Sequence, residues 1–236
     1  MRTHTTGNEA VEMYLKTIAE LTGDGTPVVI ARVAERLGVS PVSASEMMKR
    51  LIEQGYLEHE RYKGVLLTAA GQAIASSVIR RQRLWECFLA DHLNLNWSGI
   101  YETACRLEHA TSTVLAEALA AYLGHPKQCP HGNPIPAANG ETAPMPGVSL
   151  NQLRPGQTGR VACILPADTA TFAYLERCHL LPGQTFTVLD KAPFDGPITL
   201  QLGDRVVALG QSMEALIFVD TGTAEPLPAT SAALAV

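Results

Sequence analysis

The sequence lacks the patterns that mark membrane proteins and disulfide-rich proteins. Although 46% of its 236 residues are hydrophobic, no apolar run approaches the ~20 residues that a membrane-spanning helix needs. Its first ten residues are polar and lack the apolar centre of a secretory signal. The five cysteines form no Cys-x-x-Cys pair, which disfavours a disulfide framework or a four-cysteine zinc site. We therefore expect a soluble protein of the reducing cytoplasm, with a sizeable core and no membrane partner.

The sequence also lacks the familiar catalytic motifs. It contains no His-Glu-x-x-His helix, no nucleophile elbow and no glycine-rich loop that could cradle phosphates. We therefore expect no enzymatic activity and no small organic substrate.

Positive charge is scarce overall but unevenly distributed. The whole chain carries a formal net charge of −5. Residues 1–85 contain 11 Lys and Arg against 9 Asp and Glu, whereas residues 86–236 contain 7 against 14. Only the first part can present a basic face to phosphate, and local charge matters more than the total.

Proline and glycine divide the chain into regions. Residues 1–123 show mainly helical periodicity. Residues 124–148 contain six prolines and four glycines in 25 residues, which predicts an extended linker. Residues 149–220 show short alternating runs typical of strands, and Gly203-Asp204 fits a hairpin turn. The pattern predicts a mainly α protein with a small β domain.

The first region contains the parts of a winged helix-turn-helix. The segment VIARVAERL over 29–37 is stopped by Gly38, and Ser40 can cap a second helix over 41–54 with Pro41 at its first position. A basic hairpin over 56–68 follows. In such a unit the N-terminal residues of the second helix reach base edges in the major groove.

Two sets of residues are candidates for contact with DNA. Small or polar residues at the start of the second helix would face the bases: Ser40, Pro41, Val42, Ser43, Ser45 and Glu46. Basic residues around it would contact phosphates: Arg32, Lys49, Arg50, Arg61 and Lys63. The alternative is a small helical bundle whose hairpin contacts a protein partner.

A second candidate site lies in the segment ACRLEH over 104–109, in a helix expected to begin with Ser98 as its cap. Cys105, Glu108 and His109 stand at i, i+3 and i+4, so they project within about 100° of one another. A thiolate, a carboxylate and an imidazole suit Fe²⁺, Co²⁺, Ni²⁺ or Zn²⁺. By itself, however, the spacing is a weak signal, because a buried cysteine beside a solvated Glu-His pair is far commoner than a ligand triad.

Five sequence segments, considered together and in their order along the chain, identify a known family that the chain resembles. It resembles the diphtheria toxin repressor and iron-dependent regulator family (DtxR/MntR type) of bacterial metal-dependent repressors. The resemblance runs through EMYLKTI (12–18), ARVAERLGVSPVSASEMMKRL (31–51), LTAAGQAIASSVIRR (67–81), ACRLEH (104–109) and HGNPIP (131–136).

The resemblance implies a primary metal site formed by Met13, Cys105, Glu108 and His109. Taken alone, Met13 would be read as core filler in an amphipathic helix. The Met and Cys combination resembles the iron-type members, whereas manganese-type relatives carry hard oxygen ligands at these two positions. The resemblance therefore points to Fe²⁺, with Mn²⁺, Co²⁺, Ni²⁺ or Zn²⁺ as alternatives or surrogates.

The family's second, ancillary site fits this sequence poorly. Its positions fall on Gln82, Glu86 and Tyr101, and approximately on Asp168 and Thr171 in the C-terminal region. Only Glu86 and Asp168 keep good metal-binding chemistry. The other interpretation of Gln82, Glu86 and Tyr101 is an ordinary hydrogen-bonded helix surface, and a two-metal mechanism is in doubt.

The resemblance also implies an architecture and a function. It predicts a winged helix-turn-helix domain over 1–72, a helical dimerisation and metal-binding domain over 73–124, a linker over 125–148, an SH3-like barrel of the FeoA type over 149–220 and a flexible tail over 221–236. A homodimer of this kind would bind an inverted-repeat operator in double-stranded DNA when metal is bound. The alternatives are a Mn²⁺-responsive regulator of the same family, a thiol-redox regulator acting through Cys105, and a metal-binding adaptor whose winged helix contacts protein.

Overall fold

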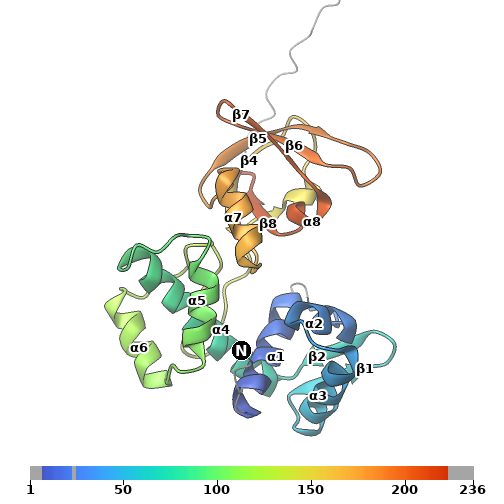
Figure 1. Cartoon of the computed structure of the whole chain (residues 1–236), viewed down its shortest axis with the longest axis vertical. Helices are drawn as coiled ribbons and strands as arrows, with labels where there is room; N and C mark the ends of the chain where they lie inside the picture. The colour runs from blue at the N-terminus through green and yellow to red at the C-terminus, as the bar shows by residue number, and fades with distance from the viewer. Residues whose placement is uncertain (1–6, 23–24, 223–236) are drawn as a thin grey trace, which may run out of the picture. The chain divides into compact units, whose positions relative to one another are not determined.

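The computed structural model describes residues 7–22 and 25–222, so residues 223–236 of the expected tail lie outside it. The chain divides into two compact units. Among the described residues, the first unit contains 7–22, 25–96, 100–129 and 134–143, and the second contains 97–99, 130–133 and 144–222. Figure 1 labels the elements of both units. No helix within 7–22 and 25–222 is both long and apolar enough to cross a membrane.

The helix-turn-helix of the first unit forms where the sequence predicts it. Helix α1 (Gly7–Leu21) precedes α2 (Ile30–Leu37) and α3 (Pro41–Glu53). Gly38 ends α2 in the left-handed region, with φ of 63°, and so makes the turn. Ser40 caps α3 by accepting a hydrogen bond of 3.0 Å from the backbone N–H of Ser43.

The wing is a two-stranded antiparallel hairpin, as expected. Strand β1 (Leu57–Glu60) pairs with β2 (Gly64–Leu67). Val28 extends the pairing through a bridge to Val65. Gly64 has φ of 133°, and a Cβ there would lie 2.2 Å from the Val28 carbonyl oxygen, so this position requires glycine.

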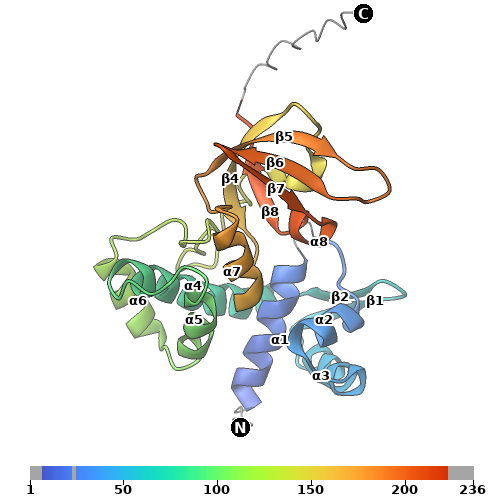
Figure 2. The ribbon, with the colours of Figure 1, turned by 45° about the horizontal axis from the view of Figure 1, so that its top comes forward.

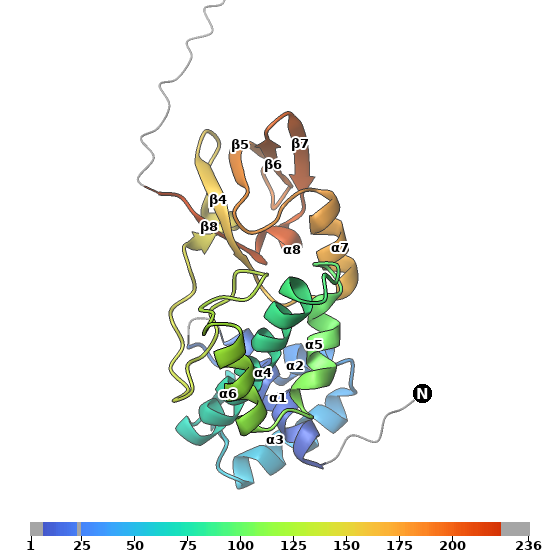
Figure 3. The same ribbon diagram turned by 90° about the vertical axis from the view of Figure 1, so that its left-hand side faces the viewer.

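Helix α4 (Ala69–Asp91) is the central element of the rest of this unit. Thr68 caps it by accepting a hydrogen bond from the backbone N–H of Gly71. The helix packs against α1, α5 (Ile100–Glu108) and α6 (Thr113–Tyr122) (Figure 3). The expected cap at Ser98 is wrong, because α5 begins only at Ile100. Residues 97–99 belong to the second unit, in which the Trp97 indole donates to the Pro130 carbonyl.

The second unit is the predicted small β domain. Its six strands form one antiparallel sheet in the order β3-β8-β4-β5-β6-β7 (Figure 2). The strands and helices span β3 (Val148–Ser149), β4 (Thr158–Ile164), α7 (Thr169–Arg177), β5 (Thr185–Lys191), β6 (Ile198–Leu202), β7 (Arg205–Leu209), α8 (Gln211–Glu214) and β8 (Ile217–Asp220), with a 3₁₀ turn over Leu150–Gln152. The turn between β6 and β7 lies at Gly203-Asp204 as predicted. The predicted fold class is confirmed.

Candidate metal centre and DNA-facing surface

A buried lysine lies at the centre of the predicted metal-binding residues. Lys16, on α1, is only 6% exposed. Its Nζ donates to both carboxylate oxygens of Glu108, at 2.9 and 2.8 Å, and to Sγ of Cys105 at 3.4 Å. His109 Nε2 lies 3.3 Å from Glu108 Oε1. The structure therefore brings three of the four predicted primary ligands together, and two of them bond to Lys16, a residue that the sequence pattern did not single out.

Burial and charge set the proton affinities in this cluster. Burial raises the pKa of Glu108 to about 7, although Lys16 opposes the shift. Burial likewise raises the pKa of Cys105 to about 12, again with opposition from Lys16. Burial would lower the pKa of Lys16, but the negative charges of the groups around it, Glu108 foremost, together outweigh burial and raise the pKa. The cluster thus keeps its lysine charged, and its thiol needs a strong cation to become a thiolate.

Glu12 orients the histidine. His109 Nδ1 donates to Glu12 Oε2 at 2.8 Å, and Arg81 holds the other oxygen at 2.9 Å. Partial burial pushes the pKa of Glu12 up, but the hydrogen bonds from His109 and Arg81 outweigh it and lower the pKa. A histidine that donates Nδ1–H to a carboxylate presents Nε2 as a ligand, which is the usual arrangement around metal-binding imidazoles.

Three residues expected at a separate ancillary site belong to the same cluster. The Gln82 amide donates to Cys105 Sγ at 3.4 Å and to Glu86 Oε1 at 3.1 Å. The Lys16 ammonium lies 5.7 Å from the centre of the Tyr101 ring. Gln82 and Glu86 are 1% and 2% exposed. The set is hydrogen-bonded, as the interpretation of an ordinary hydrogen-bonded helix surface expects, but Gln82 and Glu86 are buried because α4 packs against both α1 and α5.

Asp168 and Met13 stand apart from this hydrogen-bonded core. Asp168 lies in the second unit, where its carboxylate caps α7 by accepting from the Thr171 N–H at 2.6 Å. Met13 lies on α1, three residues before Lys16, and its side chain is 37% exposed. Met13 is therefore an exposed residue that stands about one helical turn before Lys16 on α1.

The donor chemistry of the cluster fits a divalent metal ion. It offers a sulfur, an imidazole nitrogen and carboxylate oxygens, which suit first-row transition metals. Glu20, also on α1, acts electrostatically on Cys105 and has a buried oxygen, Oε1, with no hydrogen-bond partner among the described residues. The other oxygen of Glu20, Oε2, lies 4.0 Å from the Arg36 guanidinium. The thiol, imidazole and carboxylates of the cluster are thus a donor set that a divalent ion could use in place of Lys16.

The predicted DNA-contacting residues form an accessible surface. Of the eleven, only Ser45 is half-buried, and the others are exposed. Val42, at the start of α3, is 68% exposed although it is apolar. At the tip of the wing Tyr62 is 87% exposed, with the Arg61 guanidinium 4.8 Å from its ring centre. The start of α3 and the wing are thus free to meet a large partner.

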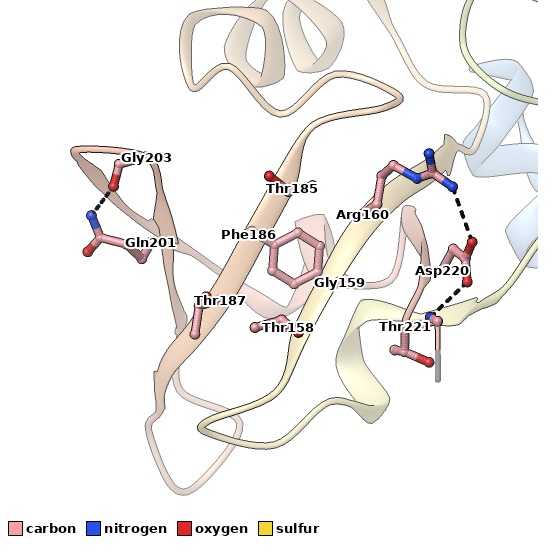
Figure 4. A pocket seen from close by; sticks show the side chains of 11 residues that line it. Thr158, Gly159, Arg160, Thr185, Phe186, Thr187, Gln201, Gly203, Asp220 and Thr221 are labelled. Atoms are coloured by element: carbon pink, nitrogen blue, oxygen red, sulfur yellow. Dashed lines mark hydrogen bonds and ion pairs between the residues drawn. The ribbon is translucent and has the colours of Figure 1, made fainter. Parts of the chain in front are cut away.

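The sheet of the second unit carries a separate open cavity of about 530 Å³. Its lining is mostly polar (Figure 4): Thr158, Gly159, Arg160, Thr185, Phe186, Thr187, Gln201, Gly203, Asp220, Thr221 and Gly222. Arg160 and Asp220 face each other across it at 3.5 Å. Phe186 also belongs to the lining, although most of its surface is buried.

Family models match most of the chain in three consecutive segments. The iron-dependent repressor N-terminal DNA-binding domain matches residues 8–65. The iron-dependent repressor metal-binding and dimerisation domain matches 68–137, and the FeoA domain matches 148–221.

Individual proteins agree with these models. The diphtheria toxin repressor of Corynebacterium jeikeium is 38% identical over 128 residues, 54% of this chain, and the match spans only about half, 53%, of that relative's length. The diphtheria toxin repressor of Corynebacterium efficiens is 30% identical over 78% of this chain and 84% of its own. A solved structure described as a manganese-dependent transcriptional repressor in complex with manganese is 34% identical, with a TM-score of 0.81 over 89% of this chain and 99% of its own. The chain belongs to the iron-dependent repressor family, which includes the diphtheria toxin repressors.

Proposed function

We propose that this protein is a metal-activated, homodimeric transcriptional repressor that binds an inverted-repeat operator and controls genes of metal-ion homeostasis. The observation that carries the proposal is the convergence of Cys105, Glu108 and His109, with His109 held by Glu12 so that Nε2 is available. The family is one of transcriptional repressors rather than enzymes. We further propose that the five-part domain division expected from the sequence applies.

The proposed metal ligands are Met13, Cys105, Glu108 and His109. The bound ion would link α1, which precedes the helix-turn-helix, to α5. Coordination would require Cys105 to release its proton, because metals bind the thiolate. If the ion favours the DNA-competent arrangement by ~2–3 kcal/mol, its binding would tighten operator binding by roughly 30–150-fold, and operator DNA would tighten metal binding equally.

The sulfur ligands favour Fe²⁺ as the physiological ion, with Mn²⁺, Co²⁺, Ni²⁺ and Zn²⁺ as alternatives. Affinity alone does not decide the metal, since selectivity depends on geometry and supply. Parallel titrations of the protein with Fe²⁺ and Mn²⁺ under anaerobic conditions would rank the two ions. A Mn²⁺-responsive regulator would show the stronger DNA response with Mn²⁺.

The central experiment measures DNA binding with and without metal. An operator is first selected from a random duplex library in the presence of metal, and binding is then followed by fluorescence anisotropy with Fe²⁺ or with a chelator. We expect Cys105→Ala and His109→Ala to abolish the metal response while the protein remains folded. Cys178→Ala and His179→Ala, at a half-buried cysteine and an exposed histidine of the second unit, should behave as wild type. Unchanged metal dependence in the first pair would remove the proposed site.

The same assay separates the remaining alternatives. A redox regulator would respond to peroxide rather than to chelator, and the raised pKa of Cys105 disfavours this because the thiolate is the reactive form. A protein-binding adaptor would retain no duplex. Direct phosphate contacts predict a steep decrease of binding with salt.

A further inference from the structure

Lys16 uses its entire hydrogen-bonding capacity on the proposed metal ligands. An ammonium has three donors, and the structure gives Lys16 three acceptors: the two oxygens of Glu108 and the sulfur of Cys105. The side chain is buried and lies over the Tyr101 ring. Glu12, Lys16 and Glu20 follow one another at four-residue spacing on α1, so this charged face of the helix is turned inward.

The ammonium and a metal ion therefore need the same atoms. A divalent ion bound to Glu108 and Cys105 would lie within a few ångströms of the Lys16 ammonium, in a buried site where like charges repel strongly. Because Lys16 already bonds to both oxygens of Glu108 and to Cys105 Sγ, the two cations compete for these atoms. A metal that takes them as ligands therefore displaces Lys16 from at least part of these bonds.

We propose that Lys16 is an internal competitor for the metal, and that metal binding transfers the link between α1 and α5 from Lys16 to Met13. The inference rests on the proposed metal site. Both residues lie on α1, one turn apart, and Met13 is accessible enough to turn toward an ion. Because Lys16 must be displaced, it weakens metal affinity and sets the metal concentration at which the protein responds. The exchange also makes the position of α1 depend on which cation is bound.

The test compares metal affinities, with Mn²⁺ as the probe and a fluorescent chelator as competitor. Lys16→Met removes the charge with a similar side-chain length, and we expect Mn²⁺ to bind at least about tenfold more tightly. Lys16→Arg keeps a cation and should remain within about threefold of wild type. The matched control is Lys191→Met, which removes the lysine facing buried Glu214 in the second unit and should leave the affinity unchanged.

Thermal unfolding supplies a second readout, which holds even where metal-free Lys16→Met is poorly folded. Mn²⁺ should raise the melting temperature of Lys16→Met, or of Lys16→Gln, by more than it raises that of wild type. Equal or weaker Mn²⁺ binding by these variants would overturn the role of Lys16 and leave the metal site standing. If wild type itself binds no Mn²⁺ and no Fe²⁺, the proposed function and this inference both fail.

Discussion

Each of the two units contains a buried glutamate paired with a lysine, and the two pairs differ in what surrounds them. Lys16 and Glu108 have side chains only 7% and 2% exposed, and both carboxylate oxygens are bonded. In the second unit Glu214 is as deeply buried, but Lys191 is 31% exposed and lies 3.4 Å from one oxygen. The other oxygen of Glu214 has no hydrogen-bond partner among the described residues.

The difference separates a ligand cluster from an ordinary ion pair. Around Lys16 the neighbours are a thiol, an imidazole and an amide, all of which can act on a metal or on its ligands. Lys191 instead donates to a backbone carbonyl, that of Asn151. A buried charge pair is therefore weak evidence for a site, whereas convergent metal-binding groups around one are strong evidence.

The largest expected effect comes from neutralising the two glutamates in turn. Glu108→Gln leaves the ammonium of Lys16 buried without its counter-charge, which should cost about 3–5 kcal/mol of unfolding free energy. Glu214→Gln should cost about 1 kcal/mol or less, because Lys191 can turn toward water. Urea unfolding of the metal-free proteins measures both. Similar losses in the two variants would contradict the distinction between the pairs.

Local signals in the sequence were enough to predict the helix-turn-helix. Ser40 caps α3, and Gly38 takes a left-handed conformation to end α2. Each of these features depends on the preferences of one or two residues. The wing and the turn at Gly203-Asp204 were predicted correctly for the same reason.

The buried cluster was only partly predictable, because burial depends on packing between distant segments. Glu12, Lys16 and Glu20 at four-residue spacing look like a solvated, salt-bridged helix face. The packing of α4 against both α1 and α5 brings Lys16 against residues of α5, and Gln82 and Glu86 of α4 are buried. The spacing in ACRLEH and the family resemblance identified Cys105, Glu108 and His109, but neither revealed the lysine between them.

A smaller effect is expected at Gln82, which supports the cluster without being charged. Gln82→Met keeps the side-chain length but removes the donor to Cys105 Sγ and Glu86 Oε1. Loss of a donor to buried acceptors should cost about 1–3 kcal/mol of unfolding free energy. Gln201→Met, at a half-buried glutamine of the second unit, is the control and should change stability by less than about 0.5 kcal/mol. If Gln82→Met does not change the unfolding free energy, the hydrogen bonds from Gln82 to Cys105 and Glu86 do not contribute to stability.

The smallest expected effect is at Glu12, on the rim of the cluster. Glu12→Gln removes the charge that faces Arg81 and His109, and partial solvent screening limits the loss to about 1 kcal/mol at neutral pH. The pKa of Glu12 is lowered in the folded protein, so its stabilising contribution is present above the unfolded-state value of 4.5. That contribution should disappear as the pH falls through the lowered pKa. Urea unfolding of wild type and Glu12→Gln at pH 7 and in the acid range should therefore show curves that differ at neutral pH and converge in acid. If the difference in unfolding free energy between wild type and Glu12→Gln is the same at both pH values, Glu12 contributes by packing rather than by its charge. Its ion pairs with Arg81 and His109 would then not stabilise the cluster.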